Sequence, residues 1–181
     1  MEAKVLIFSH VEFDQYCYER KWDDTNVESL KNHAFISIIG TKECQEHYLN
    51  EDEYHWFKEY HDNVLNLEFD DIEQDVNWKG HQFKAMTEND AKRIVDFIDN
   101  NIGKTFIVHC RAGRSRSQGI FRYITEMYYK IYDEETCGRK DNPCFSPNMH
   151  VVRLLKREFY KRMVFLLMMN IMNSKIYMKW I

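Results

Sequence analysis

The sequence predicts an α/β fold with a central, mostly parallel sheet flanked by helices. Short apolar runs rich in β-branched residues alternate with helical patterns along the chain. In the segment FIVHCRAGRSRSQG (106–119), a strand-like run leads through a loop rich in arginine and glycine into a helix. No repeat or linker divides the chain, so its 181 residues fit a single domain with a sizeable core.

Four segments are predicted as strands: 4–9, 34–40, 63–69 and 104–109. The first, second and fourth are short, apolar and β-branched, which is typical of buried strands. In the third, leucine and phenylalanine alternate with mostly polar residues, the period of a half-buried strand.

The clearest predicted helix spans residues 87–103. Thr87 can cap its start and Gly103 can end it. Its apolar face consists of Ala91, Ile94, Val95, Ile98 and Ile102.

Three further helices and one loop are predicted. A helix beginning near Ser115 carries an apolar series. This series is Ile120, Ile124, Met127 and Ile131. The last helix has Ser146 as its cap and Pro147 in its first turn. Residues 51–61, polar with four aromatic side chains, are expected to form a short helix, and residues 70–86, which have no period, a loop.

Composition and charge exclude several classes of protein. Hydrophobic residues make up 44% of the chain and aromatic residues 15%, which excludes a disordered protein. The net charge of −4 argues against a general nucleic-acid binder. Five cysteines without a C-x-x-C pair suit a reducing compartment, and the charged N-terminus does not resemble a signal peptide, so we expect a cytoplasmic protein. The eight histidines form no ligand pattern, so no metal site is expected.

The C-terminal residues 163–181 are expected to form an apolar helical extension of a domain that spans residues 1–162. Their unbroken apolar run covers only 163–169. A membrane-spanning helix needs about 20 mostly apolar residues. We therefore expect no stable membrane insertion, and expect the extension to be buried in the domain or in a partner chain, as in a homodimer. Attachment to a membrane surface is the alternative.

The loop that follows the last predicted strand has the features of an anion cradle. Backbone N–H groups at the start of a helix point at the loop's centre, and Gly113 allows a tight curl. Cys110 stands at the base of this cradle, where the same field favours its thiolate. Arg116 follows one turn into the helix, and its planar fork can hold two phosphate oxygens. A thiolate beneath a bound phosphate predicts phosphoryl transfer through a cysteinyl-phosphate.

Other uses of such a loop fit less well. A structural cysteine would leave the arginines, the glycine and the hydroxyl groups of the loop unexplained. Sulfurtransferases of the rhodanese type use a loop that is typically one residue shorter. Low-molecular-weight tyrosine phosphatases and arsenate reductases carry their loop near the N-terminus. The G-x-x-x-x-G-K-[ST] pattern of nucleotide-binding loops is absent.

The segment VHCRAGRSRS (108–117) resembles the H-C-x-x-G-x-x-R-[ST] signature of cysteine-dependent protein phosphatases, in their dual-specificity branch. LEFDDIE (67–73), followed by AKRIVDFID (91–99), is similar to the acid loop and helix of that branch. FSPNMHVVRLL (145–155) resembles its following helix. The resemblance covers roughly residues 60–160. The tyrosine-containing recognition loop of the classical tyrosine-specific branch has no equivalent here, which implies a shallower pocket.

The resemblance implies a role for each matching residue. Cys110 is the nucleophile, and Arg116 holds the phosphate and the transition state. Ser117 hydrogen-bonds the sulfur, and Asn148 braces the loop. His109 is expected to tune the thiolate through hydrogen bonds. The backbone N–H groups of the loop complete the phosphate cradle, and its residues are Arg111, Ala112, Gly113, Arg114 and Ser115.

The chemistry also needs a general acid on a loop near the cradle. The candidates are Asp70, Asp71 and Asp75. The family places the acid after two apolar strand residues spaced by two, and this register selects Asp71. Strand alternation also puts Asp71 on the face of Leu65, Leu67 and Phe69, and Asp70 on the opposite face.

The resemblance implies a phosphorylated protein as substrate, with phosphotyrosine first and phosphoserine or phosphothreonine also accepted, and no cofactor. Three arginines within six residues make the loop unusually basic. Related inositol-phosphate and phosphoinositide phosphatases carry basic residues at such positions, which leaves that substrate class open. An inactive phosphate-binding module is the alternative from another class.

Overall fold

The computed structural model describes residues 4–48, 53–129 and 146–177. In the first two segments the elements are β1 (Val5–Ser9), α1 (His10–Arg20), the 3₁₀ turn η1 (Val27–Ser29), β2 (His33–Ile39), α2 (Lys42–Tyr48), β3 (Val64–Glu68), β4 (Val76–Trp78), β5 (His81–Phe83), α3 (Glu88–Asn100), β6 (Thr105–Cys110), α4 (Arg116–Ile124) and the π-helical turn η2 (Thr125–Tyr129). The last helix is α5 (Met149–Tyr177). Ile131, placed by the sequence on the face of α4, lies outside the described residues.

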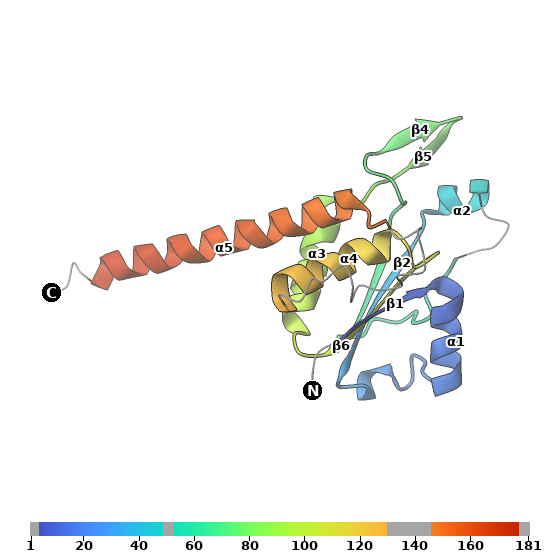
Figure 1. The fold of residues 1–181 in the computed structure, drawn as a ribbon, viewed down its shortest axis with the longest axis horizontal. Coiled ribbons are helices and arrows are strands. Elements are labelled where there is room, and N and C mark those ends of the chain that lie inside the picture. Colours follow the sequence, from blue (N-terminus) through green and yellow to red (C-terminus); the bar gives the residue numbers. More distant parts are fainter. Residues whose placement is uncertain (1–3, 49–52, 130–145, 178–181) are drawn as a thin grey trace.

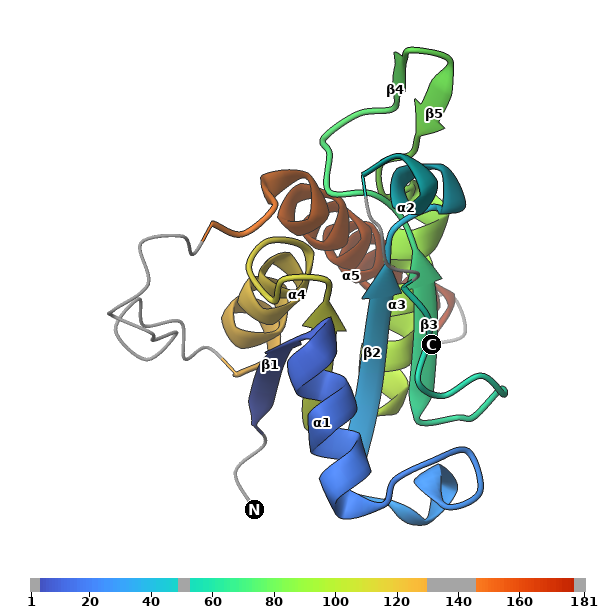
Figure 2. The same ribbon diagram turned by 90° about the vertical axis from the view of Figure 1, so that its right-hand side faces the viewer.

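Four strands form one sheet in the order β1-β6-β2-β3, and every neighbouring pair is parallel. The prediction of a parallel sheet flanked by helices is therefore confirmed, and all four predicted strands lie in it. Figure 2 shows α1 in front of the sheet and α3, α4 and α5 behind it. Because the strands are parallel, their carboxyl ends share one edge, where ligands bind in open α/β sheets.

Each face of the sheet has its own hydrophobic core. Along β6, Phe106, Val108 and Cys110 belong to the larger core, together with residues of α3, α4 and α5. Ile107, from the same strand, belongs to the smaller core beneath α1. The alternation of side chains along the strand thus sends the cysteine toward the α4 face and the adjacent His109 toward α1.

The helix predicted at 87–103 is shorter than expected. Thr87 caps it, with Asp90 completing a reciprocal pair of side-chain-to-backbone bonds. Four residues of the predicted apolar face are buried, but Ile102 lies beyond the helix end and is 53% exposed. Helix α1 was not foreseen, although Ser9 and Glu12 form the same reciprocal cap at its start.

The predicted short helix at 51–61 is wrong for residues 53–61, which form neither helix nor strand. Its aromatic side chains do not share one face, because they contact different parts of the fold. Phe57 lies in the core beneath α1, the Trp56 Nε1 donates to the Trp22 carbonyl (2.7 Å), and Tyr60 is exposed.

The segment predicted as a loop at 70–86 contains the antiparallel hairpin β4–β5. The hairpin projects from the carboxyl edge of the sheet near α2 (Figure 1). Lys79 and Gly80 both have positive φ at its tip, a turn conformation that suits glycine. The Glu43 carboxylate of α2 accepts a bond from the Gln82 backbone N–H (2.6 Å), which ties the hairpin to that helix.

Helix α5 begins at Met149, and its cap is Asn148 rather than the predicted Ser146. The Asn148 side-chain oxygen accepts bonds from the backbone N–H groups of His150 (3.0 Å) and Val151 (3.2 Å). Asparagine is a strong cap, and its bonds occupy two of the helix's free N–H groups.

The second half of α5 extends away from the rest of the molecule (Figure 1). All seven apolar side chains from Met163 to Met169 are 42–63% exposed, so they are not docked on the domain. Of the helices described, none is long and apolar enough to cross a membrane.

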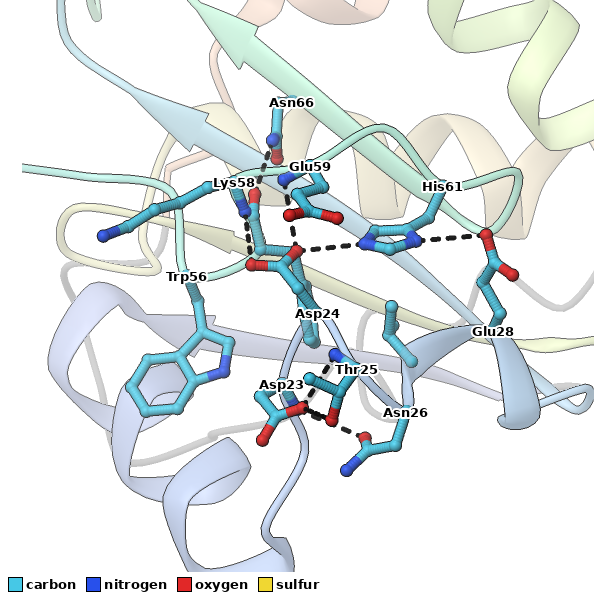
Figure 3. A network of polar contacts seen from close by, with 12 residues as sticks. Asp23, Asp24, Thr25, Asn26, Glu28, Trp56, Lys58, Glu59, His61 and Asn66 are labelled. Atoms are coloured by element: carbon cyan, nitrogen blue, oxygen red, sulfur yellow. Dashed lines mark hydrogen bonds and ion pairs between the residues drawn. The ribbon is translucent and has the colours of Figure 1, made fainter.

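A polar cluster around His61, here called the His61 brace, fixes the segment before β3 (Figure 3). The two ring nitrogens of His61 lie 3.0 Å from Asp24 Oδ1 and 3.2 Å from Glu28 Oε1. Asp24 also accepts bonds from the backbone N–H groups of Lys58 and Glu59. Burial opposes the charged imidazolium, but the two carboxylates raise the pKa of His61 above its usual value.

Candidate active site

The loop from Arg111 to Ser115 joins the end of β6 to the start of α4. Gly113 has φ +66° and lies so close to the β1–α1 junction that a Cβ would come 2.8 Å from backbone atoms of Phe8 and Ser9. Four loop carbonyls accept hydrogen bonds. That of Arg111 accepts from the His10 N–H (3.0 Å) and that of Gly113 from the Gln118 side chain (2.9 Å), while those of Arg114 and Ser115 accept from backbone N–H groups of α4 and of the residues around the start of α5. Only glycine fits this curl.

The backbone donors of the same loop are not used by the described part of the chain. No backbone N–H of residues 111–115 donates to another described residue. Ser115, the cap position of α4, makes no side-chain bond to the helix backbone. Free N–H groups at a helix N-terminus form an anion site.

Cys110 is the last residue of β6 and is 2% exposed. Its Sγ lies 3.2 Å from the Ser117 Oγ in the first turn of α4. Two other described cysteines are unsuited to nucleophilic chemistry. Burial raises the pKa of Cys17 to about 12, and burial together with Asp70 raises that of Cys44 to about 11.

Arg116, the first residue of α4, is 5% exposed. One terminal nitrogen of its guanidinium donates to the Phe69 carbonyl at the end of β3 (2.7 Å), while its Nε has no hydrogen-bond partner among the described residues. A buried guanidinium with an unused donor is costly without a ligand. The arrangement suits an anion that enters the cradle.

The three candidate acids lie in different surroundings. Asp71 is exposed, and its Oδ1 accepts bonds from the Ser115 Oγ (2.7 Å) and the Asn148 side-chain amide (2.8 Å). Both bonds go to Oδ1, so Oδ2 has no partner among the described residues. A carboxylate from the end of β3 thus lies beside the loop that carries the cysteine and the arginine.

Asp70 and Asp75 are occupied elsewhere. Asp70 is buried and accepts bonds from the Thr41 N–H, the Thr41 hydroxyl and the Lys84 N–H (2.8–2.9 Å). Asp75 accepts from the Ala85 N–H (2.9 Å). Both carboxylates fix the base of the hairpin.

Asn148 is buried and links three parts of the site. Its backbone N–H donates to the Ser115 carbonyl (3.1 Å), and its side chain caps α5 and bonds Asp71. The expected bracing residue therefore contacts both the loop and the candidate acid.

His109 is fully buried and stacks on Phe13, with ring centroids 4.1 Å apart. Neither ring nitrogen has a hydrogen-bond partner among the described residues, so the expected hydrogen-bond network does not form around it. Burial, helped by nearby positive groups, holds the pKa of His109 well below its usual value, and the ring stays neutral. It packs as an apolar side chain against α1, on the face of β6 opposite to that of Cys110.

The sequence did not single out two polar residues at the site. Gln118 is buried and its side-chain amide donates to the Gly113 carbonyl, while its side-chain oxygen has no partner among the residues that the structure describes. Glu53 bonds the Gly40 N–H (2.6 Å) and lies 3.9 Å from the Arg111 Nε. No pattern could have indicated Glu53, because the segment that places it has neither helical nor strand periodicity.

Within the described part of the chain, no group of three or more histidine, cysteine or acidic side chains is arranged to hold a metal ion. The site therefore brings together a thiol, a buried guanidinium, free N–H donors and a carboxylate. These groups can bind a phosphate, attack it and protonate a leaving oxygen.

No family model and no curated protein matches the sequence. Solved structures that are similar in fold include the following three. One, the PTP-2 phosphatase of Cydia pomonella, is 17% identical, with a TM-score of 0.45 and 84% of each chain covered. The human tyrosine phosphatase-like serine/threonine/tyrosine-interacting protein is 19% identical, with a TM-score of 0.41, covering 78% of this chain and 85% of that one. PTPMT1 is 15% identical, with a TM-score of 0.41, covering 87% of this chain and 90% of that one. Likeness at this level carries no evidence about activity.

Proposed function

We propose that the protein is a metal-independent phosphatase that hydrolyses phosphomonoesters through a cysteinyl-phosphate at Cys110. Its substrates are phosphorylated proteins, phosphotyrosine first and phosphoserine or phosphothreonine next, in the cytoplasm. One observation carries the proposal: the Asp71 carboxylate, far away in sequence, is bonded to Ser115 in the loop between Cys110 and Arg116. A structural cysteine would need neither the acid nor the free donors.

In the first step, the Cys110 thiolate attacks phosphorus and forms the S–P bond. The bond from phosphorus to the ester oxygen breaks, and Asp71 donates its proton to that oxygen. The N–H groups of residues 111–115 and the Arg116 guanidinium stabilise the equatorial oxygens, where charge accumulates.

In the second step, the Asp71 carboxylate takes a proton from water as the water oxygen attacks phosphorus. The S–P bond breaks, inorganic phosphate leaves, and the thiolate is restored. The Ser117 hydroxyl, 3.2 Å from Sγ, donates to the departing sulfur and lowers the barrier of this step.

A second candidate function is hydrolysis of an inositol phosphate or phosphoinositide. The exposed Arg111 and Arg114 favour it, because both lie on the cradle loop where further phosphates of such a substrate would lie. An inactive phosphate-binding module is the candidate from another class. The full set of Cys110, Arg116 and Asp71 argues against it.

Turnover of an aryl phosphate separates these possibilities. We expect hydrolysis that orthovanadate inhibits and that a chelator leaves unchanged, because the proposed steps use only side chains and backbone N–H groups of the protein. A panel of phosphotyrosine and phosphoserine peptides, phosphoinositides and soluble inositol phosphates then identifies the substrate class. Absence of turnover would favour the binding module, and activity restored by a divalent ion after chelation would contradict the mechanism.

A further inference from the structure

The segment from Glu53 to Phe57 is irregular, yet four of its side chains are tied by hydrogen bonds to other elements. The Tyr54 hydroxyl donates to Asp14 on α1 (2.7 Å), and the His55 ring lies 2.6 Å from the Ser37 hydroxyl on β2. Trp56 is tied to a carbonyl after α1, and Glu53 to the N–H of Gly40. The segment is therefore a fixed part of the fold at the end of β2.

This position lies at the rim of the phosphate cradle. Ser37 of β2 pairs with His109 of β6 in the sheet. Gly40 directly follows the end of β2, and the cradle loop directly follows the end of β6, so Gly40 lies beside the start of that loop. The tie to Gly40 thus holds the Glu53 carboxylate next to Arg111, the first residue after the cysteine.

The Glu53 side chain is 6% exposed, and its Oε1 has no hydrogen-bond partner among the described residues. The only ion pair found for it there is with the Arg111 Nε at 3.9 Å, beyond hydrogen-bond distance. A buried carboxylate that lacks donors on one oxygen depends on a nearby cation for its stability. Arg111 is therefore already engaged with a carboxylate of the protein, although the sequence counted it among the arginines that make the loop basic.

Two consequences follow for a substrate. A second anionic group beside the scissile phosphate would compete with Glu53 for Arg111, and it would be repelled by the Glu53 charge. Because the carboxylate is buried and fixed by Gly40, it cannot turn away into solvent.

We propose that Glu53 is a selectivity residue that disfavours a second anionic group next to the scissile phosphate. This inference rests on the proposed phosphatase function and narrows its substrate class. The preferred substrates are phosphoproteins with a neutral residue beside the phosphorylated one, rather than polyphosphorylated inositols.

The test uses two phosphotyrosine peptides that differ only in a glutamate or a glutamine immediately before the phosphotyrosine. The readout is the ratio of kcat/KM for the glutamate peptide to that for the glutamine peptide. Glu53→Gln keeps an oxygen for the Gly40 N–H but removes the charge, and we expect it to raise the ratio about 3–5-fold, the effect of one partly screened charge pair. The gain should shrink at high salt.

Arg111→Gln leaves Glu53 uncompensated, so it should change the ratio in the opposite direction and lower it by a similar factor. This second variant keeps the proposal testable if Glu53→Gln fails to fold. Glu59→Gln removes the same charge from an exposed position in the following stretch of chain, and it should leave the ratio unchanged.

An unchanged or lowered ratio in Glu53→Gln, or an unchanged ratio in Arg111→Gln, would overturn the proposal. Failure of the phosphatase function itself would look different. In that case the wild-type protein would hydrolyse neither peptide nor an aryl phosphate.

Discussion

The His61 brace and the cradle loop (residues 111–115) lie at opposite ends of the same sheet. They differ in whether their buried polar groups have hydrogen-bond partners. In the brace, before β3, both ring nitrogens of His61 have carboxylate partners. In the loop, after β6, the Arg116 Nε and the N–H groups of residues 111–115 have no partner among the described residues. A cluster that satisfies itself stabilises the fold, whereas one that leaves donors unused is arranged for a ligand. Breaking each cluster should therefore give a different kind of defect.

The largest effect is expected at the loop. Cys110→Ser should abolish turnover, because a serine hydroxyl at this position is a far poorer nucleophile than a thiolate. Phosphate binding, measured by calorimetry, should persist since the N–H groups and Arg116 remain. Residual activity above about 1% of wild type would contradict covalent catalysis by this thiol.

Asp71→Asn should lower kcat on a phosphotyrosine peptide by about 10²–10⁴-fold, the usual contribution of a positioned acid. The loss should be much smaller on an aryl phosphate with a stable phenolate, because that leaving group hardly needs a proton. Steady-state kinetics on both substrates measures the difference.

Asp70→Asn is the matched control for this acid. Since Asp70 accepts three bonds in the hairpin base, its replacement should cost about 1–3 kcal/mol of unfolding free energy. It should produce no leaving-group dependence. A large, leaving-group-dependent defect in Asp70→Asn alone would assign the acid role to Asp70.

Disruption of the His61 brace should lower the free energy of unfolding and leave turnover unchanged. His61→Gln loses two bonds to carboxylates and should lower the free energy of unfolding by about 1–2 kcal/mol, at the low end for charged pairs because Glu28 is exposed. Because the folded-state pKa of His61 is raised, its contribution is complete below the unfolded-state pKa of about 6.5 and is lost as the pH rises through the higher folded-state pKa. Urea unfolding at pH 6 and pH 8 should show the larger loss at pH 6. Equal losses would mean that His61 acts as a neutral ring.

The pH dependence of stability contributed by His109 has the opposite sign to that contributed by His61. Its folded-state pKa is lowered, so the folded protein keeps it neutral while the unfolded chain takes up a proton below pH 6.5. Stability should therefore fall with decreasing pH, by up to about 1.4 kcal/mol per pH unit for this residue. His109→Phe should make the acid side of the stability profile shallower. A profile as steep as that of the wild type would show that other groups cause it.

The smallest effect is expected far from both clusters. Leu167→Ala should change the free energy of unfolding by less than about 0.5 kcal/mol, because the side chain is exposed on the projecting half of α5. Leu155→Ala, on the buried half of the same helix, should cost about 2–5 kcal/mol. Thermal unfolding of the pair measures this contrast. A large loss at Leu167 would mean that this half is buried against another chain, such as a second copy.

The sequence predicted the sheet and the loop because both follow from local patterns. The apolar runs specify strands, and the register of Leu65, Leu67 and Phe69 singled out Asp71, which is hydrogen-bonded to Ser115 in the structure. Glu53 could not be foreseen, because an irregular segment owes its course to contacts such as that with Gly40 rather than to a repeat. The free donors of the cradle also become visible only when all hydrogen bonds are known.

The close contact of Gly113 with Phe8 and Ser9 also affects how the protein folds. The cradle takes its shape only against the β1–α1 junction, and β1 must first pair with β6, which lies about 100 residues later in the chain, as Val5 does with Phe106. Contacts between such distant segments require closure of a long loop and form slowly. During synthesis, the nascent chain holds its N-terminal strand unpaired until β6 emerges. Recovery of phosphate binding during refolding should therefore lag behind formation of local helices such as α3, and it would report the last long-range contact to form.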